Sequence, residues 1–141
     1  MAPRDTRTGG VLERMVLPAL EQGQYSYKTQ AHIGVRLGGG RHLVDVLATD
    51  ASGRNYLISL KWQQTSGTAE QKVPFEVICL AEAISSGEGQ YSAAYVVLGG
   101  GGWKLRDFYV GGGLDKHLTS ANRVRVITLE DFIGRANKGQ L

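Results

Sequence analysis

The stretch that decides how this chain folds is HLVDVLATDASGRNYLISLKWQ, residues 42–63. It contains two apolar runs, HLVDVLA at 42–48 and NYLISLKWQ at 55–63. The residues between them, TDASGR at 49–54, are typical of a turn. Folding the two runs back on each other about Ser52 and Gly53 predicts an antiparallel β-hairpin.

Each of these apolar runs carries one charged residue. The predicted register places Asp45 opposite Leu60 and Lys61, and side-chain alternation puts Asp45, Ser59 and Lys61 on one face. Because burying a lone charge is costly, such groups are usually paired or hold a metal. Two interpretations follow: a simple cross-strand ion pair, or a site for metal-dependent phosphodiester hydrolysis, which needs a carboxylate and a lysine with further acids nearby.

The rest of the chain predicts helices and strands around this hairpin. Hydrophobic spacing and turn residues give the order α, three β, α and β, followed by another β and α. The order predicts an α/β fold with a mixed central sheet flanked by helices. We expect a single domain over 1–141, with a core at about 11–98 and a variable C-terminal segment at 99–141. The expected helices are 8–22, 73–85 and 130–139, and the expected strands are 25–37, 42–48, 56–63, 92–100 and 123–129.

Composition narrows the class of protein. The chain has 141 residues, which suits one compact domain, and it has no run of about 18 apolar residues, so no membrane span is expected. Cys79 is the only cysteine, which excludes an internal disulfide and favours the cytoplasm. The net charge of +3 points weakly to a polyanionic partner. The glycine clusters match no nucleotide-binding loop, and the three histidines have no zinc-site spacing.

The hairpin motif resembles that of a known nuclease group. Val44-Asp45 followed by Ser59-Leu60-Lys61 resembles the motif of the PD-(D/E)XK nuclease superfamily, an acid on one strand and acid-x-Lys on the next. The usual proline is missing from the first half, and Ser59 stands where the second acid is usual. In this respect the chain resembles a branch of type II restriction enzymes that carries Ser-x-Lys and takes its second acid from the following helix. The resemblance covers about 11–98 and implies a restriction-endonuclease-like α-β-β-β-α-β core.

The resemblance also implies roles for the acids and the lysine. Asp45 would bind Mg²⁺, with Mn²⁺ as a substitute, and Lys61 would orient or help to deprotonate the attacking water. The second acid would be Glu76, fifteen positions after Lys61, or Glu70, which is nearer in sequence. If Pro74 opens the helix, Glu76 falls in the first turn, where negative charge is favourable.

Two further contributions belong to the same expectation. A backbone carbonyl near Leu60 would complete the metal site. Glu13 lies on the first predicted helix, where the superfamily often carries an additional acid; a solvated helix residue is the alternative.

The same reasoning gives candidates for contact with DNA. Gln63 has the same strand parity as Lys61 and is a candidate for touching the scissile strand; the alternative is a solvated strand end. Five basic residues are candidates for phosphate contacts beside the site: Lys28, Arg36, Arg41, Arg54 and Lys72.

The leading hypothesis is a Mg²⁺-dependent DNA endonuclease of the restriction or mobile-element type. One alternative is a Holliday-junction resolvase-like nuclease, and another is a non-catalytic DNA-binding module on the same fold. Because cutting a duplex with one small domain usually takes two active sites, we expect a homodimer or tetramer.

Overall fold

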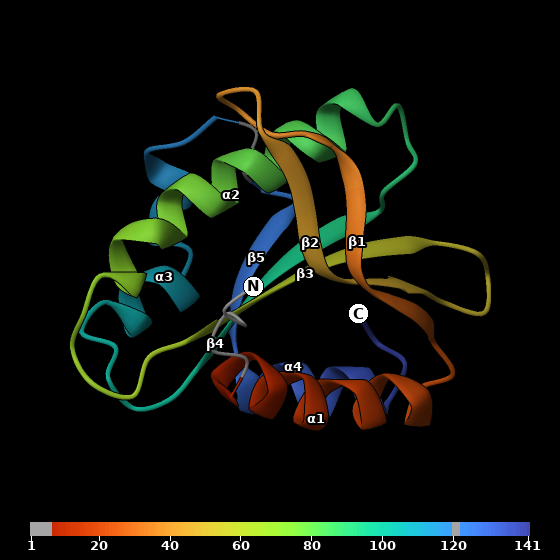
Figure 1. The fold of residues 1–141 in the computed structure, drawn as a ribbon, viewed down its shortest axis with the longest axis horizontal. Helices are drawn as coiled ribbons and strands as arrows, with labels where there is room; N and C mark the ends of the chain where they lie inside the picture. The colour runs from red at the N-terminus through yellow and green to blue at the C-terminus, as the bar shows by residue number, and fades with distance from the viewer. Residues whose placement is uncertain (1–6, 120–121) are drawn as a thin grey trace, which may run out of the picture.

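The computed structural model describes residues 7–119 and 122–141 (Figure 1). Its elements follow the predicted order, and residues 103–122, which had no clear sequence pattern, contain a short helix and a 3₁₀ turn. The elements are α1 (Arg7–Gln22), β1 (Ser26–Val35), β2 (Arg41–Thr49), β3 (Asn55–Trp62), α2 (Ala69–Ser86), β4 (Ala93–Gly99), α3 (Arg106–Val110), η1 (Gly113–Lys116), β5 (Val124–Thr128) and α4 (Leu129–Asn137).

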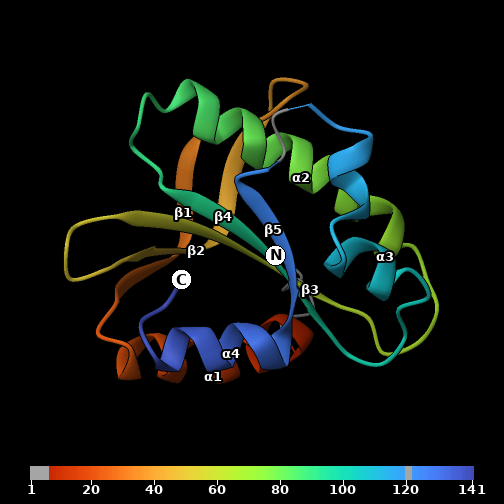
Figure 2. The same ribbon diagram turned by 180° about the vertical axis from the view of Figure 1, so that it is seen from behind.

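The five strands form one mixed sheet in the order β1-β2-β3-β4-β5, which confirms the predicted fold class. The pairs β1–β2 and β2–β3 are antiparallel, and the pairs β3–β4 and β4–β5 are parallel. Parallel neighbours need a long crossover. Helix α2 supplies the crossover between β3 and β4, and it lies across one face of the sheet (Figures 1 and 2).

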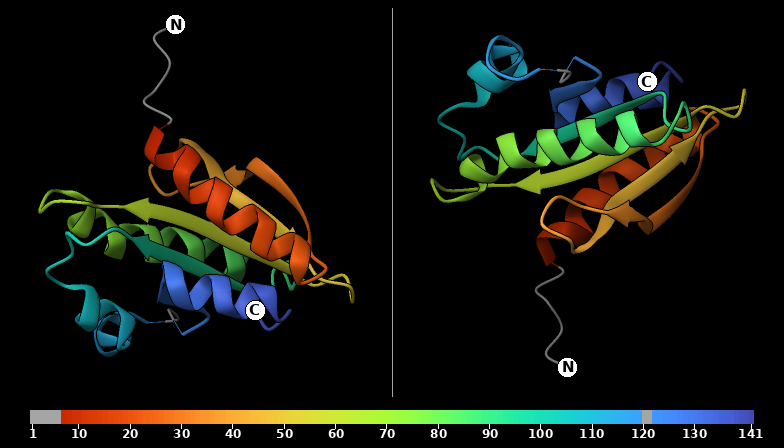
Figure 3. Two further views of the ribbon diagram at one scale, coloured as in Figure 1. Left: turned by 90° about the horizontal axis from the view of Figure 1, so that it is seen from below. Right: turned by 90° about the horizontal axis from the view of Figure 1, so that it is seen from above.

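Helices cover both faces of the sheet. Figure 3 shows α1 and α4 side by side on one face and α2 on the other. Alternate residues of β3 point to opposite faces. Ile58 therefore packs in the core beneath α1 and α4, whereas Leu57 packs against the α2 residues Val73 and Val77. In the described part of the chain, every helix is too short or too polar to span a bilayer.

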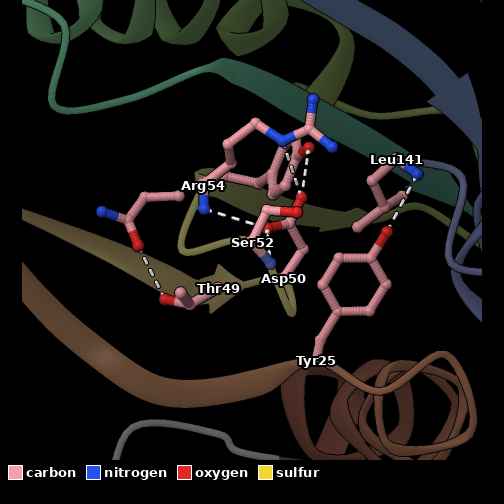
Figure 4. Close-up of polar contacts among 8 residues, drawn as sticks. Tyr25, Thr49, Asp50, Ser52, Arg54 and Leu141 are labelled. Carbon is pink, nitrogen blue, oxygen red and sulfur yellow. Dashed lines mark hydrogen bonds and ion pairs between the residues drawn. The ribbon is translucent and has the colours of Figure 1, made fainter.

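The turn between β2 and β3 fixes the register of the hairpin. The Asp50 carboxylate accepts hydrogen bonds from the backbone N–H groups of Ser52 and Arg54, both at 2.9 Å, and Arg54 Nε lies 3.0 Å from the same carboxylate (Figure 4). The turn therefore centres on Ser52, and Gly53 adopts the positive φ of 88° that glycine allows.

The predicted register is wrong by one residue. The ladder pairs Thr49 with Asn55 and ends at Val46 and Ile58, so its continuation puts Asp45 opposite Ser59 and not Leu60. The error arose because the side chain of Asp50 shapes a longer turn than the two-residue turn that the sequence suggested. Alternation from Leu57 places Ser59 and Lys61 on the α2 face of β3, and the Asp45 carboxylate reaches the Leu60 N–H from β2.

Helix α2 begins earlier than predicted, at Ala69 and not at 73. Pro74 therefore lies inside the helix, where its missing N–H leaves the Glu70 carbonyl without its usual partner. The Tyr109 hydroxyl donates to that carbonyl at 2.7 Å. The prediction that Glu76 occupies the first helical turn is consequently wrong, and the helix dipole does not account for its position.

Two loops run together at the carboxyl ends of β3 and β4. Gln63 N donates to the Gly99 carbonyl at 3.0 Å, and Gly102 N donates to the Gln63 carbonyl at 2.9 Å. The backbone of Gly102 passes so close that an added Cβ would lie 2.6 Å from backbone atoms of Thr65. This close contact fixes the segment that follows Lys61.

The contact makes a stability prediction. Gly102→Ala should lower the free energy of unfolding by about 1–3 kcal/mol, the usual cost of forcing atoms into a packed site. Gly101→Ala is the matched control, because a Cβ there meets nothing within 4 Å. Urea denaturation of both variants measures the difference, and equal stabilities would contradict the close loop packing.

Candidate active site

A lysine and a glutamate meet between β3 and α2. Lys61 is near the carboxyl end of β3, where it pairs with Leu98 of β4. Its Nζ lies 3.6 Å from Oε2 of Glu76, and the two side chains are 24% and 11% exposed. The sheet and the crossover helix thus bring together two residues that the sequence assigned to one site.

Asp45 completes the group from β2. Its Oδ2 accepts a hydrogen bond from Leu60 N at 2.7 Å, just beyond the end of the β2–β3 ladder. Burial raises the pKa of Asp45 above its ordinary value, although the Leu60 N–H and the positive charge of Lys61 act against the rise. The negative charge of Glu76 raises the pKa further. The two carboxylates therefore lie close enough to repel each other.

Ser59 lies on the same face as this group. It is 3% exposed and follows Ile58, the last residue of β3 that the ladder pairs with β2. The acid that contacts Lys61 on this face is Glu76 of α2.

Glu76 has a second cationic partner that the sequence did not identify. Arg36, from the turn between β1 and β2, places Nη2 at 3.5 Å from Glu76 Oε2 and 3.7 Å from Cys79 Sγ. Its guanidinium also lies over the ring of Phe75, 5.5 Å from the centroid. The sequence marks Arg36 only as a candidate for a phosphate contact. Its contact with Glu76 has no local signal, because its partners are 40 or more residues away in α2.

His42 is a residue that the sequence did not single out. It is 2% exposed, and its Nε2 is buried without a hydrogen-bond partner. Burial lowers its pKa below the ordinary value, although the negative charge of Glu76 acts in the opposite direction. His42 is therefore a buried side chain in the surroundings of the Glu76 and Arg36 pair.

Glu70, the alternative second acid, is used elsewhere. Its Oε1 accepts hydrogen bonds from the backbone N–H groups of Lys104 and Leu105, the latter at 3.1 Å. Its carbonyl accepts from Tyr109. Glu70 therefore anchors the segment after β4 to α2, and Glu76 is the helix acid that the structure brings to Lys61.

Gln63 is also used within the protein. It is 5% exposed, its Nε2 donates to the Gly102 carbonyl at 2.8 Å, and its Oε1 accepts from Ala69 N at 3.1 Å. It is therefore neither a solvated strand end nor a residue presented to a DNA strand, and both interpretations are corrected. The amide holds the first residue of α2 instead.

The other predicted residues differ in their surroundings. Lys28, Arg41 and Lys72 are all exposed, as a phosphate contact requires. Glu13 lies on α1, which covers the face of the sheet opposite to α2 (Figure 3). Within the described residues, none of the ion pairs joins Glu13 to Asp45, Lys61 or Glu76.

The donors at this site suit a hard divalent cation. In the described part of the chain no three His, Cys, Asp or Glu side chains gather into a metal cluster. Mg²⁺, however, is commonly bound by only one or two carboxylates and keeps several waters. Asp45 and Glu76 supply two carboxylates. Burial raises the pKa of Asp45 and the negative charge of Glu76 adds to the rise, so a bound cation would favour the ionised carboxylate. The residues present therefore fit Mg²⁺ or Mn²⁺.

Comparison with known proteins agrees with this geometry. The family model described as a PD-(D/E)XK nuclease superfamily domain matches residues 4–140. The chain belongs to the PD-(D/E)XK nuclease superfamily. The match includes the C-terminal residues after β4 as well as the hairpin and α2, and it indicates a nuclease.

A solved structure has a fold similar to that of this chain. The crystal structure of AF1548, a protein of unknown function, is similar with a TM-score of 0.50 and 13% sequence identity over 86% of this chain. The chain spans 56% of the length of that protein, and the likeness concerns the fold alone. No curated protein matches the chain significantly.

Proposed function

We propose that this PD-(D/E)XK domain is a metal-dependent DNA endonuclease of the restriction or mobile-element type, with Asp45, Glu76 and Lys61 in its active site. The observation that carries the proposal is the 3.6 Å contact between Lys61 and Glu76 on the face that also holds Asp45. A carboxylate pair with an adjacent ammonium group is the set of side chains that hydrolysis of a phosphodiester requires.

Each residue has a distinct role in this proposal. Asp45 and Glu76 hold the divalent cation, which when bound acidifies a water and polarises a phosphoryl oxygen. Lys61 donates hydrogen bonds to the attacking water and offsets negative charge on the phosphate as it reacts. The backbone at Leu60 fixes the carboxylate of Asp45 through its N–H, and the hydroxyl of Ser59 is a donor for an ordered water. The Leu60 carbonyl stays a proposed oxygen ligand.

Charge outside the site supports a nucleic-acid substrate. The chain carries a net charge of +3, and Lys28, Arg41 and Lys72 expose their side chains to solvent. Such residues bind phosphates without reading sequence. Cleavage of both strands of a duplex by so small a domain calls for a second copy of the chain, and we propose a homodimer or tetramer as the active form.

The test is cleavage of supercoiled plasmid DNA with Mg²⁺, with Mn²⁺ and with a chelator. We expect nicked and linear products with either metal and none with the chelator. Parallel incubations with a four-way junction and with single-stranded RNA define the substrate class. Preferred cutting of the junction would identify a resolvase-like nuclease, whereas DNA binding without cleavage would support the non-catalytic module.

Lys61→Met tests the catalytic part of the proposal. Cleavage should fall by about 10²–10³-fold, the usual cost of removing one donor that stabilises charge in the transition state. Mn²⁺ binding, measured by calorimetry, should persist because Lys61 is not a metal ligand. Unchanged cleavage by this variant would contradict the role given to Lys61.

A further inference from the structure

Arg36 holds the carboxylate that the proposed metal site needs. A single oxygen of Glu76, Oε2, lies 3.5 Å from Arg36 Nη2 and 3.6 Å from Lys61 Nζ. The local charges are thus two carboxylates, Asp45 and Glu76, and two cations, Lys61 and Arg36. In this arrangement Arg36 provides part of the positive charge that a divalent cation would bring.

The hydrogen-bonding capacity of Arg36 is incompletely used. Its Nε is buried without a hydrogen-bond partner, and the Nη2 contacts at 3.5 and 3.7 Å are long. An unsatisfied buried donor is costly, and contacts of that length stabilise little. No short hydrogen bond therefore fixes the guanidinium, which stays beside Glu76 through its charge and its contacts with Cys79 and Phe75, and a cation that binds Glu76 can displace it.

The surroundings of Arg36 allow its side chain a second position, towards solvent. The backbone is fixed in the turn between β1 and β2, where Arg36 N donates to the Gly40 carbonyl at 2.8 Å. The side chain is 32% exposed and rests over Phe75, itself 47% exposed. A small rotation of the side chain would carry the guanidinium from Glu76 towards solvent at the mouth of the site.

A phosphate is the ligand that this guanidinium fits. Its planar array of N–H donors matches two phosphate oxygens at once, which a lysine cannot do. The backbone of DNA presents such a group beside each bond that a nuclease can cut. Rotation of the Arg36 side chain away from Glu76 would meet two requirements of the reaction. It would free the Glu76 carboxylate for the cation, and it would present a hydrogen-bond donor to the phosphate.

We infer that Arg36 exchanges partners during the reaction: it holds Glu76 in the metal-free protein, yields it to the divalent cation, and binds a phosphate of the DNA backbone beside the scissile bond. The inference rests on the proposed metal site between Asp45 and Glu76. It assigns Arg36 two opposite effects: Arg36 weakens metal binding by competing for Glu76, and it speeds cleavage by binding the DNA phosphate.

The experiment compares Arg36→Met with Arg135→Met in the full chain. Removing Arg36 should tighten Mn²⁺ binding, measured by calorimetry without DNA, by about tenfold, because a like charge and a competitor for Glu76 are lost. Cleavage of plasmid at saturating Mn²⁺ should fall by about a hundredfold as the phosphate contact disappears. Arg135 lies on α4, which covers the face of the sheet opposite to α2, and its Nη1 donates to the Gln140 carbonyl, so its loss should leave both quantities unchanged.

Arg36→Lys guards against a folding defect in the Met variant. It keeps the charge that competes with the metal and loses the paired donors, so Mn²⁺ affinity should stay within about twofold and cleavage should fall by about tenfold. Wild-type cleavage by Arg36→Lys, or metal binding and cleavage that fall together in Arg36→Met, would overturn the inference and leave the proposed nuclease intact. A wild-type chain that binds no Mn²⁺ would overturn the proposed function, and this inference with it.

Discussion

Asp45→Asn is expected to abolish metal-dependent cleavage and at the same time to stabilise the metal-free protein. The loss of activity follows because the amide removes one of the two carboxylates that hold the cation, which is worth several kcal/mol of barrier or about a thousandfold in rate. The gain in stability follows because burial and the charge of Glu76 oppose ionisation of Asp45 in the folded state. The gain should be about 1 kcal/mol at pH 7, the scale seen when a strained functional site is neutralised.

The gain in stability should depend on pH in a defined direction. The pKa of Asp45 is raised on folding, so the folded state binds the proton more tightly than the unfolded chain does. The difference in unfolding free energy between Asp45→Asn and wild type is therefore largest above the pKa of Asp45 in the folded state. It vanishes as the pH falls below the pKa of Asp45 in the unfolded chain, about 3.9. Urea denaturation of both proteins between pH 4 and pH 8, with a chelator present, measures this trend.

Asp50→Asn is the matched control in the same hairpin. Burial would raise the pKa of Asp50, but the N–H groups of Arg54 and Ser52 and the Tyr56 hydroxyl outweigh it and hold the pKa below its ordinary value. Asp50→Asn should accordingly destabilise the protein and leave the rate constant for cleavage unchanged.

Added metal should reverse the order of stabilities at Asp45. Wild type gains about 2.7 kcal/mol at a metal concentration one hundred times its Kd, whereas Asp45→Asn gains little. Cleavage by Asp45→Asn near the wild-type rate would exclude this site, whatever its stability.

The parts of the fold that local sequence determines were predicted well. The hairpin, the order of elements and the mixed sheet follow from apolar runs and turn residues that lie next to each other in the chain. The register was wrong by one residue because it depends on hydrogen bonds from Ser52 and Arg54 to the side chain of Asp50. Composition identifies a turn here, but it does not specify which side chain closes it.

The errors around α2 have a different cause. The sequence predicts a helix that opens at Pro74, because proline is usually tolerated only in the first turn of a helix. Pro74 is accommodated in the interior because Tyr109, 39 residues from Glu70, donates to the carbonyl that Pro74 leaves free. The spacing from Lys61 pointed to Glu76, and the structure brings the two side chains to 3.6 Å. The second argument, that Glu76 lies in the first turn of the helix, is wrong because α2 begins at Ala69. Contacts between distant segments also explain why Arg36 and His42 were not identified as neighbours of Glu76.

Glu76→Gln is expected to reduce cleavage by about a thousandfold or more, whereas Glu82→Gln leaves it unchanged. Glu76 lies 3.6 Å from Lys61 and shares the site with Asp45, so the amide removes a proposed metal ligand and the ion-pair partner of Lys61 together. Glu82 is exposed on the same helix and makes no side-chain contact with these groups in the part of the chain that the structure describes. Plasmid cleavage at saturating Mn²⁺, with Mn²⁺ binding by calorimetry, measures both effects.

Glu70→Gln separates the two acids that the sequence offered. Because the Glu70 carboxylate accepts from the N–H groups of Lys104 and Leu105, its neutralisation should lower the free energy of unfolding by about 1–2 kcal/mol. The rate constant for cleavage should be unchanged at temperatures where the variant is folded. A Glu70→Gln variant that is stable but inactive, alongside an active Glu76→Gln, would mean that Glu70 leaves its backbone partners to complete the site. An inactive Glu76→Gln beside an active Glu70→Gln would place the second acid at Glu76, about one and two-thirds turns further along α2 and in contact with Lys61. Glu76 would then supply the carboxylate that Ser59 lacks.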